Sequence, residues 1–550
     1  MINIFCKNTG ETNSFQEGTS LLDMLPSFNF PQPLPIISAK VNNVSQGLKY
    51  RAFNSKDVEF LDGTSFSACR VYCRSLCFML SKAASDVFPG SRLYMEYSIS
   101  NGYFINFYKA DGSGPKVEDI DAIRNRMMEL VEEDLPFHRL EARLDDAISI
   151  FKKIGYMDKV KLLETSDQPY TDYYTLGDKA DYYYGRLVPS TGYLKVWALD
   201  PYENGMLLRA PESDDPLHVK EAIPQPKTFA VFSEMLKWNI IMGLKNVGDL
   251  NHACLDGRAS DLIQISEALQ EKKIVSIAEE IDRRAREEKP LKIVLITGPS
   301  SSGKTTFCKR LSVQLKACGI HPISISTDDY FVNREDSPLL PNGQYDFDNF
   351  DTVDHDYLQK DLLKLLDGET VEVPEFNFVT GKREYNGKKL KLDKGKVLLL
   401  EGIHALNPRL TDRIEESLKF RIFISTLTCI SLDSHNWIPT SDNRLLRRII
   451  RDYNKGAFTP VQTISQWKAV RDAESKWIYP YQENADVMFN SSYLIEFAVL
   501  RNHAVPILNT VPKNCKEYSE AHRLLKFLHY FVPVSDKEIP ATSMMKEFIG

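Results

Sequence analysis

The clearest chemical signature in the sequence is GPSSSGKT at residues 298–305, which matches the pattern G-x-x-x-x-G-K-[ST] of a phosphate-binding loop. Its two glycines allow the backbone to curl so that N–H groups point inward at phosphate oxygens. Lys304 is expected to reach the β- and γ-phosphates of ATP, and Thr305 to place its hydroxyl on Mg²⁺. An apolar strand precedes the loop and a helix is expected after it, which favours this interpretation over a chance glycine-rich turn. The predicted ATP contacts are Gly298, Ser300, Ser301, Ser302, Gly303, Lys304, Thr305 and Thr306.

Acidic residues end two other predicted strands. Glu401 closes the run LLLE, and Asp328 and Asp329 follow the run PISIS. In a parallel sheet the carboxyl ends of the strands meet at the crevice where ligands bind. Glu401 is therefore a candidate Mg²⁺ ligand, directly or through water, and Asp328 a candidate base for a substrate hydroxyl. The alternatives are an ordinary strand-ending acid for Glu401 and a turn or helix cap for the aspartates.

An arginine-rich run, DNRLLRRIIRDYNKG, contains Arg444, Arg447, Arg448 and Arg451. Spacings of three and four residues align these side chains along one side of a helix. On a mobile lid they would neutralise charge on the transferred phosphoryl group, whereas the simpler alternative is a solvated helix face. His404, close to Glu401, is interpreted as a structural histidine more readily than as a functional one.

The elements that must position these residues form an α/β domain. From residue 292 onward short apolar strands alternate with helices, including helices near residues 357–366 and 408–417, and this order predicts a parallel sheet covered on both faces. The chain has 550 residues, which favours two to four domains. Upstream, residues 1–62 are predicted to form a β-rich module. Residues 65–219 are expected to mix strands with helices, one of them over residues 140–154, and a proline cluster at residues 211–226 marks a linker.

Composition limits the function classes. A net charge of −7 does not suggest broad affinity for nucleic acids, although a local basic patch remains open. The chain begins without a signal-peptide pattern, and its most apolar long stretch, residues 229–244, carries two charges and reads as a buried helix. Nine cysteines fit reduced thiols, and we expect a cytoplasmic protein with no membrane segment. Cys69, Cys73 and Cys77 share one helix face and are predicted to pack in a core rather than bind a metal.

Residues from about 290 to 500 resemble the uridine kinase and phosphoribulokinase family. The resemblance rests on several motifs in the same order, which are GPSSSGKTT, STDDYF, YDFDNFDTVD, VPEFNFVTGKR, LLLEGIHAL, DNRLLRRIIRD and ENADVMFN. It implies a P-loop kinase that uses ATP and Mg²⁺, with Asp328 and Lys304 catalytic and Thr305 and Glu401 at the metal. It also implies a helical lid carrying Arg448 and Arg451 over the ATP phosphates.

The same resemblance implies an acceptor site. Asp348 matches an acid that binds ribose hydroxyls, and Phe376 and Phe378 match an aromatic pair that flanks the base. The implied substrate-binding residues are Asp348, Phe376, Phe378, Arg383 and Arg444. One position departs from the family pattern, because Gly381 stands where uridine kinases have a histidine that recognises the pyrimidine. The acceptor is therefore left open between a nucleoside and another hydroxyl compound that bears a sugar.

The N-terminal half is similar to threonyl-tRNA synthetases. IISAKVNNVSQGL and DVEFLDG resemble the TGS domain, while PFHRLEARLDDAISIFKKIG and YYYGRLVPSTGYLKVW resemble the editing-type domain. The positions of the family's metal ligands fall on Phe78, Lys82, Tyr183 and Leu187, so neither Zn²⁺ nor editing hydrolysis is expected. The predicted domains are a β-grasp TGS-like domain at 1–62, an α+β editing-like domain at 63–220, a helical linker at 221–288 and a kinase domain at 289–550.

These inferences predict an ATP-dependent kinase that phosphorylates a nucleoside, at the ribose 5′-OH. Two alternatives remain open. One is a regulatory protein that binds RNA or a nucleotide through its N-terminal half and uses ATP as a switch, and the other is a kinase of a non-nucleoside sugar. The sequence leaves an oligomer possible.

Overall fold

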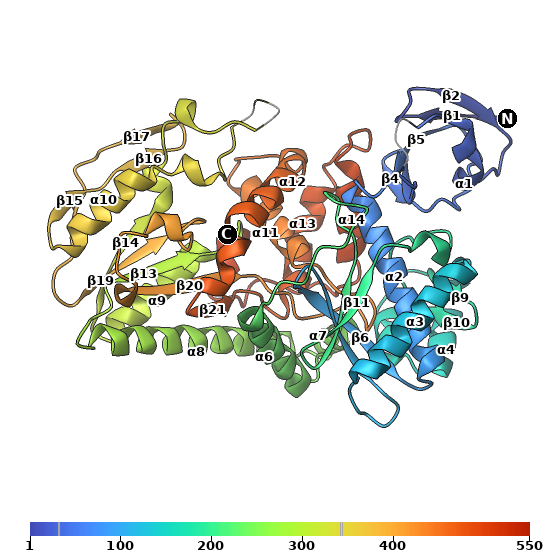
Figure 1. The fold of residues 1–550 in the computed structure, drawn as a ribbon, viewed down its shortest axis with the longest axis horizontal. Coiled ribbons are helices and arrows are strands. Elements are labelled where there is room, and N and C mark those ends of the chain that lie inside the picture. The colour runs from blue at the N-terminus through green and yellow to red at the C-terminus, as the bar shows by residue number, and fades with distance from the viewer. Residues whose placement is uncertain (31–33, 341–342, 344) are drawn as a thin grey trace.

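The computed structural model describes residues 1–30, 34–340, 343 and 345–550 (Figure 1). The sheet at the centre of the C-terminal part has five parallel strands in the order β14-β19-β13-β20-β21. Its strands are β13 (Ile293–Thr297), β14 (His321–Ser326), β19 (Lys396–Glu401), β20 (Lys419–Ser425) and β21 (Val487–Asn490). The central strand β13 is buried along its whole length, as expected for a strand covered by helices on both faces.

The register of this sheet explains why the predicted site residues meet. Ile296 of β13 lies opposite Glu401 of β19, and Ser326 of β14 lies opposite the same residue. The phosphate loop, the turn that carries Asp328 and the end of β19 therefore share one edge of the sheet. The helices of this part are α9 (Lys304–Ala317), α10 (His355–Leu366), α11 (Thr440–Asn454), α12 (Pro460–Trp477), α13 (Glu496–Leu508), α14 (Tyr518–Leu528) and α15 (Lys546–Ile549).

Two short antiparallel hairpins stand beside the main sheet. They pair β15 (Thr370–Glu372) with β18 (Lys389–Lys391), and β16 (Glu375–Asn377) with β17 (Lys382–Glu384). The helix predicted near residues 408–417 is wrong, because the structure has only two short 3₁₀ turns, Pro408–Leu410 and Glu416–Leu418. Asn407 caps the first turn, and the segment after it is held on the core by Leu410 and Ile414 without forming a regular helix.

The first residues form a mixed five-stranded sheet in the order β2-β1-β5-β3-β4, with β1 parallel to β5. This N-terminal sheet stands apart at the upper right of Figure 1. Its core contains Ile4, Val58 and Phe60 from alternating inward positions of the strands. Its elements are β1 (Ile2–Cys6), β2 (Thr12–Phe15), α1 (Leu21–Met24), β3 (Ser38–Val41), β4 (Val44–Gln46) and β5 (Lys56–Leu61).

The second region wraps two antiparallel sheets around the long helix α2 (Phe66–Val87). The sheet orders are β11-β12-β7-β6 and β10-β9-β8. Residues 140–143, predicted to begin a helix, instead extend β8, and the helix α4 starts at Leu144. The other elements are β6 (Arg92–Ile99), β7 (Gly102–Tyr108), α3 (Val117–Glu133), β8 (His138–Arg143), α4 (Leu144–Ile154), α5 (Met157–Glu164), β9 (Tyr170–Leu176), β10 (Lys179–Asp181), β11 (Ala198–Tyr202) and β12 (Gly205–Arg209).

Three helices connect the second region to the C-terminal part of the chain. They pack against both parts and do not form an extended linker. They are α6 (Pro226–Met242), α7 (Val247–Leu255) and α8 (Ala259–Ala285). Ile274 and Ile281 of α8 belong to the same buried cluster as Phe307 of α9 and Phe151 of α4. One hydrophobic core therefore runs from the second region into the kinase-like part.

Helix α6 corrects the prediction of a buried helix at residues 229–244. One face packs on β6 and β7, where Phe232 stacks on Tyr97 with ring centroids 3.7 Å apart. On the opposite face, Ile240 and Ile241 are 58% and 72% exposed. The apolar residues at 229–244 therefore extend beyond the part of α6 that the neighbouring elements cover.

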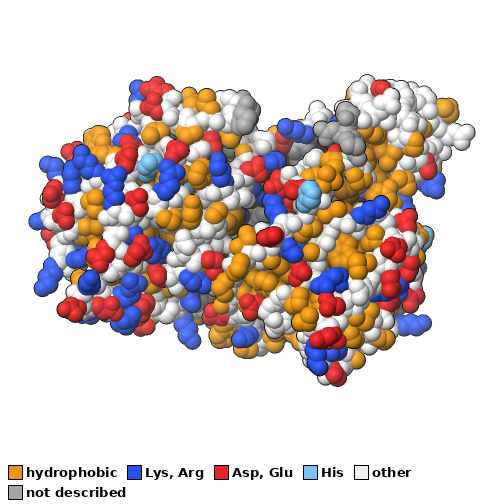
Figure 2. Space-filling view, in the orientation of Figure 1, with side chains coloured by type: hydrophobic (Ala, Val, Ile, Leu, Met, Phe, Trp, Pro, Cys, Tyr) orange, Lys and Arg blue, Asp and Glu red, His pale blue; other side chains and the backbone are white. Residues whose placement is uncertain are grey.

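Positive and negative side chains are interspersed over the face drawn in Figure 2, which fits the small net charge of −7. Within the part of the chain that the structure describes, no helix is both long enough and apolar enough to cross a membrane.

Candidate active site

The phosphate loop connects β13 to α9 in a conformation that requires its glycines. A Cβ on Gly298 would lie 2.1 Å from the carbonyl oxygen of Ile424, so no side chain fits there. Gly303, which precedes the first residue of α9, has a φ of +87°. That left-handed backbone favours glycine and aims the start of the helix, with its partial positive charge, at the centre of the loop.

Lys304 lies close enough to four acids for their charges to act on its ammonium group. Its Nζ donates hydrogen bonds to the carbonyl oxygens of Gly298 at 2.9 Å and Pro299 at 3.1 Å. Burial lowers the pKa of Lys304, and the acids that oppose this effect are Glu401, Asp328, Glu547 and Glu474. The ammonium group of Lys304 is therefore held against the loop by two backbone carbonyl oxygens of the loop and by the negative charge of the surrounding acids.

Asp328 follows β14 in a single 3₁₀ turn, residues 327–330. Ser326 caps that turn by accepting the Asp328 N–H, so the Asp328 carboxylate is not needed as the cap. Burial raises the pKa of Asp328 to about 6, while the nearby Lys304 charge lowers it. Asp329 turns toward the hairpin β16–β17, where Phe376 supplies a backbone hydrogen bond to its carboxylate. Only Asp328 of the two faces Lys304.

Glu401 and Thr305 supply oxygen atoms suited to Mg²⁺. The Thr305 hydroxyl donates to Glu401 Oε1 at 3.4 Å, while Glu401 Oε2 is buried with no hydrogen-bond partner among the described residues. Burial raises the pKa of Glu401 to about 7. An unpartnered carboxylate oxygen beside a hydroxyl fits a cation that binds few protein oxygens and takes the rest from water and phosphate. The described residues hold no cluster of three or more His, Cys, Asp or Glu side chains that would form a complete protein cage.

Asp348 reaches the same centre from the segment before α10. Burial raises its pKa, and the charges of Arg448 and Lys304 lower it. His404 lies deeper, 1% exposed, with its ring edge-to-face on Phe350 at 5.5 Å. Burial lowers the pKa of His404 to about 4, so this histidine is neutral at physiological pH. Its position in the core agrees with the structural interpretation.

The arginine run does not form a solvent-exposed helix face. Its first two arginines, Arg444 and Arg447, are fixed by ion pairs and are not free to move as part of a lid. Arg444 and Arg447 are 1% and 0% exposed and form buried ion pairs with Glu474 and Glu496. The periodicity was compatible with an exposed face, but α11 packs between α12 and α13, which supply those carboxylates. Arg444 therefore lies behind Glu474 and does not open onto a substrate space.

Arg448 and Arg451 lie nearer the loop. Arg448 Nη1 donates to the Ser300 hydroxyl at 3.0 Å. Arg451 lines a cavity of about 580 Å³ together with Thr305 and Thr306. Contacts of these two arginines with a nucleotide stay a prediction, and Arg444, predicted to bind substrate, is instead buried against Glu474.

On the acceptor side, the two rings of the predicted aromatic pair contact each other. Phe376 is 8% exposed, Phe378 is 62% exposed, and their rings meet edge-to-face at 5.1 Å. Arg383, expected to bind substrate, instead donates to the backbone carbonyls of Tyr330 and Phe331 and pairs with Asp354. Arg383 therefore links the hairpin β16–β17 to the turn that carries Asp328, and this role is structural.

Gly381 occupies the tight turn of that hairpin. Its φ is +70°, its N–H donates to Asn377 O at 2.7 Å, and an added Cβ would lie 2.8 Å from Cβ of Arg334. A histidine at this position would strain the backbone and collide with Arg334. The conformation of the hairpin therefore requires glycine at position 381, where the uridine kinase pattern has histidine.

Sequence reasoning missed two acids that touch the phosphate loop. Glu474 of α12 accepts the Ser300 N–H at 2.8 Å. Glu547 of α15 accepts both the Thr306 N–H at 3.2 Å and the Thr306 hydroxyl at 2.7 Å. Neither acid lies in a recognisable motif, and Glu547 is 241 residues from Thr306 along the chain, so no local pattern could have found them.

In the second region, two of the four positions matched to the synthetase metal ligands lie side by side. The rings of Phe78 and Tyr183 are 5.4 Å apart, and Lys82 pairs with Asp86 and Asp178. Aromatic rings fill this place. Cys73 and Cys77 belong to the surrounding hydrophobic core, as predicted, while Cys69 is partly exposed at its edge.

Comparison with known proteins addresses the class. The family model described as Phosphoribulokinase / Uridine kinase family matches residues 293–494. A uridine kinase of Vibrio vulnificus (strain YJ016) is 30% identical over 222 residues, which cover 39% of this chain and 95% of that protein. The chain belongs to the phosphoribulokinase/uridine kinase family through this C-terminal part, and the family implies ATP binding.

The N-terminal region resembles segments of threonine–tRNA ligases. The ligase of Syntrophotalea carbinolica is 29% identical over 192 residues, which are 34% of this chain and 30% of that protein. The chain thus spans less than a third of the length of that relative. A solved structure from Bacillus stearothermophilus, described as a possible uridine kinase, is 18% identical and covers 40% of this chain and 98% of its own. Its TM-score of 0.28 is too low to add to the fold assignment.

Proposed function

We propose that the protein is an ATP-dependent phosphotransferase that phosphorylates the ribose 5′-OH of a nucleoside. The observation that carries this proposal is the convergence of Lys304, Asp328, Glu401 and Asp348 at one edge of the parallel sheet. A nucleotide-binding loop alone would serve a switch, but Asp328 and Asp348 add the acids that an acceptor hydroxyl needs.

In the proposed mechanism, the loop N–H groups and Lys304 hold the ATP phosphates, and Arg448 and Arg451 approach them from α11. Asp328 would orient the acceptor hydroxyl and take its proton as the oxygen attacks the γ-phosphorus, while the bond from the γ-phosphorus to the β,γ-bridging oxygen breaks and ADP leaves. Asp348 binds the sugar hydroxyls. Mg²⁺, held near Thr305 and Glu401, supplies charge neutralisation on the phosphates when bound.

The proposed domain plan assigns residues 1–62 to a β-grasp, TGS-like domain and residues 63–220 to an editing-like α+β domain. Residues 221–288 form the connecting helices, and residues 289–550 the kinase domain. The strand order β2-β1-β5-β3-β4 around a short helix supports the β-grasp assignment.

A second acceptor class, a non-nucleoside sugar, is favoured by the hairpin geometry. Gly381 cannot give way to a base-reading histidine without strain, and Phe376 is already packed on Phe331 at 5.5 Å. A site without a hydrogen-bonding group for the base edge discriminates weakly among bases.

The test is a screen of ADP release by the full-length protein with ATP, Mg²⁺ and a panel of nucleosides, pentoses and pentose phosphates. We expect one acceptor class to raise ADP release well above the rate without acceptor, and Lys304→Ala to remove that increase. ATP binding without stimulation by any acceptor would refute the kinase proposal and favour a switch or binding protein.

A further inference from the structure

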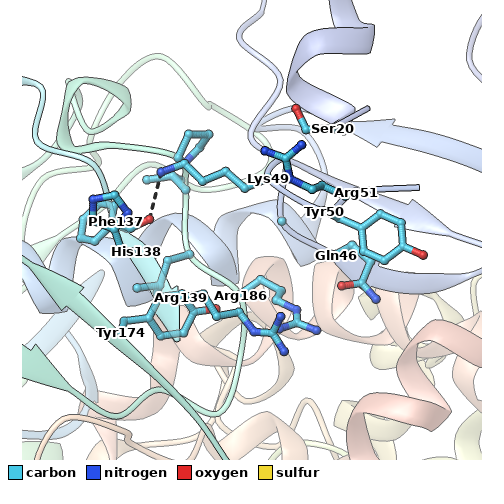
Figure 3. A pocket seen from close by; sticks show the side chains of 14 residues that line it. Ser20, Gln46, Lys49, Tyr50, Arg51, Phe137, His138, Arg139, Tyr174 and Arg186 are labelled. Carbon is cyan, nitrogen blue, oxygen red and sulfur yellow. Dashed lines mark hydrogen bonds between the residues drawn. The ribbon is translucent and has the colours of Figure 1, made fainter. Parts of the chain in front are cut away.

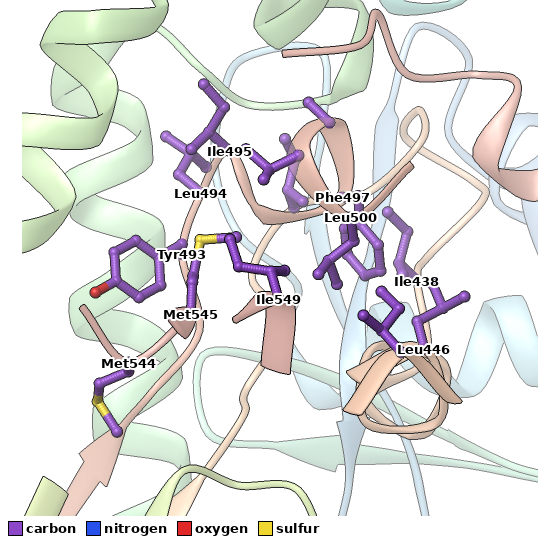
Figure 4. Packing of buried hydrophobic residues seen from close by; sticks show 14 of the residues in the cluster. Ile438, Leu446, Tyr493, Leu494, Ile495, Phe497, Leu500, Met544, Met545 and Ile549 are labelled. Atoms are coloured by element: carbon purple, nitrogen blue, oxygen red, sulfur yellow. The ribbon is translucent and has the colours of Figure 1, made fainter. Parts of the chain in front are cut away.

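The last residues of the chain cover the phosphate loop. Residues 543–550, here called the C-terminal segment, include the short helix α15 and pack against α11. Met544 and Met545 are 0% and 1% exposed, and Figure 4 shows Met545 and Ile549 among the buried side chains around Tyr493 and Leu494. The segment is therefore seated in the core rather than resting on the surface.

The contacts made by this segment fall on the residues expected to hold phosphate. Glu547 accepts the N–H and the hydroxyl of Thr306 with one carboxylate oxygen. A Cβ on Gly303 would lie 2.7 Å from Cε of Met544, so this methionine packs directly on the loop glycine. A carboxylate on the N–H and hydroxyl of Thr306, in the first turn of α9, occupies the kind of place that a phosphate oxygen would take.

The charge at the site points the same way. Glu547 adds a negative charge to those of Asp328 and Glu401 around Lys304, whereas the charge of Glu474 is compensated by its ion pair with Arg444. ATP would bring further negative charge into this partly buried space, where repulsion is stronger than in water. Binding of ATP and the present position of Glu547 therefore oppose each other.

We propose that the C-terminal segment is an autoinhibitory plug that ATP must displace from the phosphate loop. The inference rests on the proposed nucleotide site and concerns its regulation. Phe548 lies against the Arg447 guanidinium, 4.7 Å from the ring centroid, and the Ser543 hydroxyl lies 3.0 Å from Tyr493 OH. These contacts hold the segment on both sides of Glu547, so displacement of the segment by ATP must also break them.

The first test compares ATP affinity, by calorimetry, in the full-length protein and in Glu547→Gln. Glutamine keeps the size of the side chain and removes the charge, so we expect Kd for ATP to fall about tenfold. Glu538→Gln, an exposed acid nine residues earlier, is the matched control and should leave Kd unchanged. Equal or weaker ATP binding by Glu547→Gln would overturn the plug.

The second test follows hydrogen exchange of the wild-type protein. ATP should increase exchange of the amides in residues 546–550, because the segment leaves its seat. Unchanged or slower exchange there would contradict displacement. The kinase proposal fails separately: a gain in ATP affinity in Glu547→Gln without any phosphorylated acceptor would leave the plug standing, whereas acceptor turnover without that gain would reject the plug alone.

An independent feature lies in the N-terminal half. A cavity of about 550 Å³, here called the basic pocket, opens between the N-terminal sheet and β8 (Figure 3). Its cationic lining is Lys49, Arg51, Arg139 and Arg186. Lys49 donates to the carbonyl oxygen of Phe137 at 3.0 Å, so a backbone group rather than an acid holds its ammonium.

The positive charge of the basic pocket is only partly balanced. Asp172 pairs with both Arg139 and Arg186, at 2.6 Å and 3.4 Å. Behind them Arg74 is 8% exposed, donates to the Arg186 carbonyl and forms no ion pair within the described chain. Burial and the charge of Arg186 lower the pKa of the neighbouring Lys526 to about 8. Buried cations without partners are costly, and a bound anion would relieve that cost.

We infer that the basic pocket binds a small molecule bearing two or more phosphate groups. Its volume suits such a ligand, and paired guanidinium groups match phosphate geometry. The site lies on different elements from the phosphate loop.

The probe is inorganic pyrophosphate, measured by calorimetry in the Lys304→Ala background to weaken the phosphate loop. We expect Arg139→Gln to weaken binding at least tenfold, and Arg286→Gln, on the exposed end of α8, to leave it unchanged. No pyrophosphate binding, or binding insensitive to Arg139→Gln, would overturn the inference. An RNA oligonucleotide that binds where pyrophosphate does not would also reject the small ligand.

Discussion

At the scale of single residues, Asp328 differs from its neighbour Asp329 in what it faces. The first lies in the field of Lys304, Asp348 and Glu401, and the second turns toward Phe376 and Lys388. Motif spacing predicted both to lie at the carboxyl end of β14. Motif spacing could not show that Ser326 caps the turn, which leaves the carboxylate of Asp328 free to act on a substrate.

Asp328→Asn should lower kcat for phosphoryl transfer by about 10²–10⁴-fold, because the amide cannot accept the acceptor proton. ATP affinity should change little, since Asp328 forms no hydrogen bond with the loop in the described structure. Asp329→Asn is the matched control and should retain kcat within about tenfold. Steady-state kinetics decide, and a kcat above about a tenth of wild type in Asp328→Asn would remove its assigned role.

The pH profile provides a second prediction at this scale. Burial raises the pKa of Asp328 to about 6, and a general base acts only when deprotonated. kcat/KM for the acceptor should therefore be constant above that pH and fall about tenfold per pH unit below it. An acid limb centred near 4, the ordinary range of an exposed aspartate, would be inconsistent with the buried base.

At the scale of elements, the alternation of strands and helices was predictable because the buried parallel strands are short apolar runs. The runs before Gly298, Asp328 and Gly402 all form strands of one sheet, in an order that brings their ends together. Residues 408–417 were mispredicted because a proline followed by Leu410 and Ile414 at helical spacing resembles a helix start, yet the structure buries both residues in a segment that has only short 3₁₀ turns. The two acids on the loop come from α12 and α15, whose placement depends on packing across the core.

The hairpin β16–β17 yields an element-scale prediction. Gly381→Ala should cost about 1–2 kcal/mol for the left-handed backbone and about 1–3 kcal/mol more for the collision with Arg334. Gly387→Ala has a similar φ, +75°, with no atom within 4 Å of the added Cβ, and should cost the backbone term alone. Urea unfolding compares the two, and equal losses would show that Arg334 yields without cost.

At the scale of the whole molecule, the two halves are joined by buried charges. Lys159 of α5 lies 3.0 Å from Asp181 and 2.8 Å from Asp433, and all three side chains are fully buried. His435 adds a contact of 2.6 Å to Asp181. The segment that contains Asp433 and His435 leads directly into α11, so the second region fixes the start of the helix that carries Arg448. Lys159 and Asp433 are 274 residues apart, and no sequence pattern links them.

Lys159→Met should lower the free energy of unfolding by about 3–5 kcal/mol, because two buried carboxylates lose their cation. Lys468→Met, at the exposed pair with Asp472, should change it by less than about 1 kcal/mol. Urea titration followed by circular dichroism measures both. A loss at Lys159 no larger than that at Lys468 would mean that the junction does not depend on this cluster.

The most direct test of the kinase account follows the γ-phosphoryl group itself. Full-length protein is incubated with γ-labelled ATP, Mg²⁺ and each acceptor of the panel, and the labelled products are separated. The account predicts label on a hydroxyl of one acceptor class, and about 10²–10⁴-fold slower labelling when the Asp328→Asn protein replaces the wild type. Label found only in ATP and inorganic phosphate, with every acceptor unmodified, would contradict it.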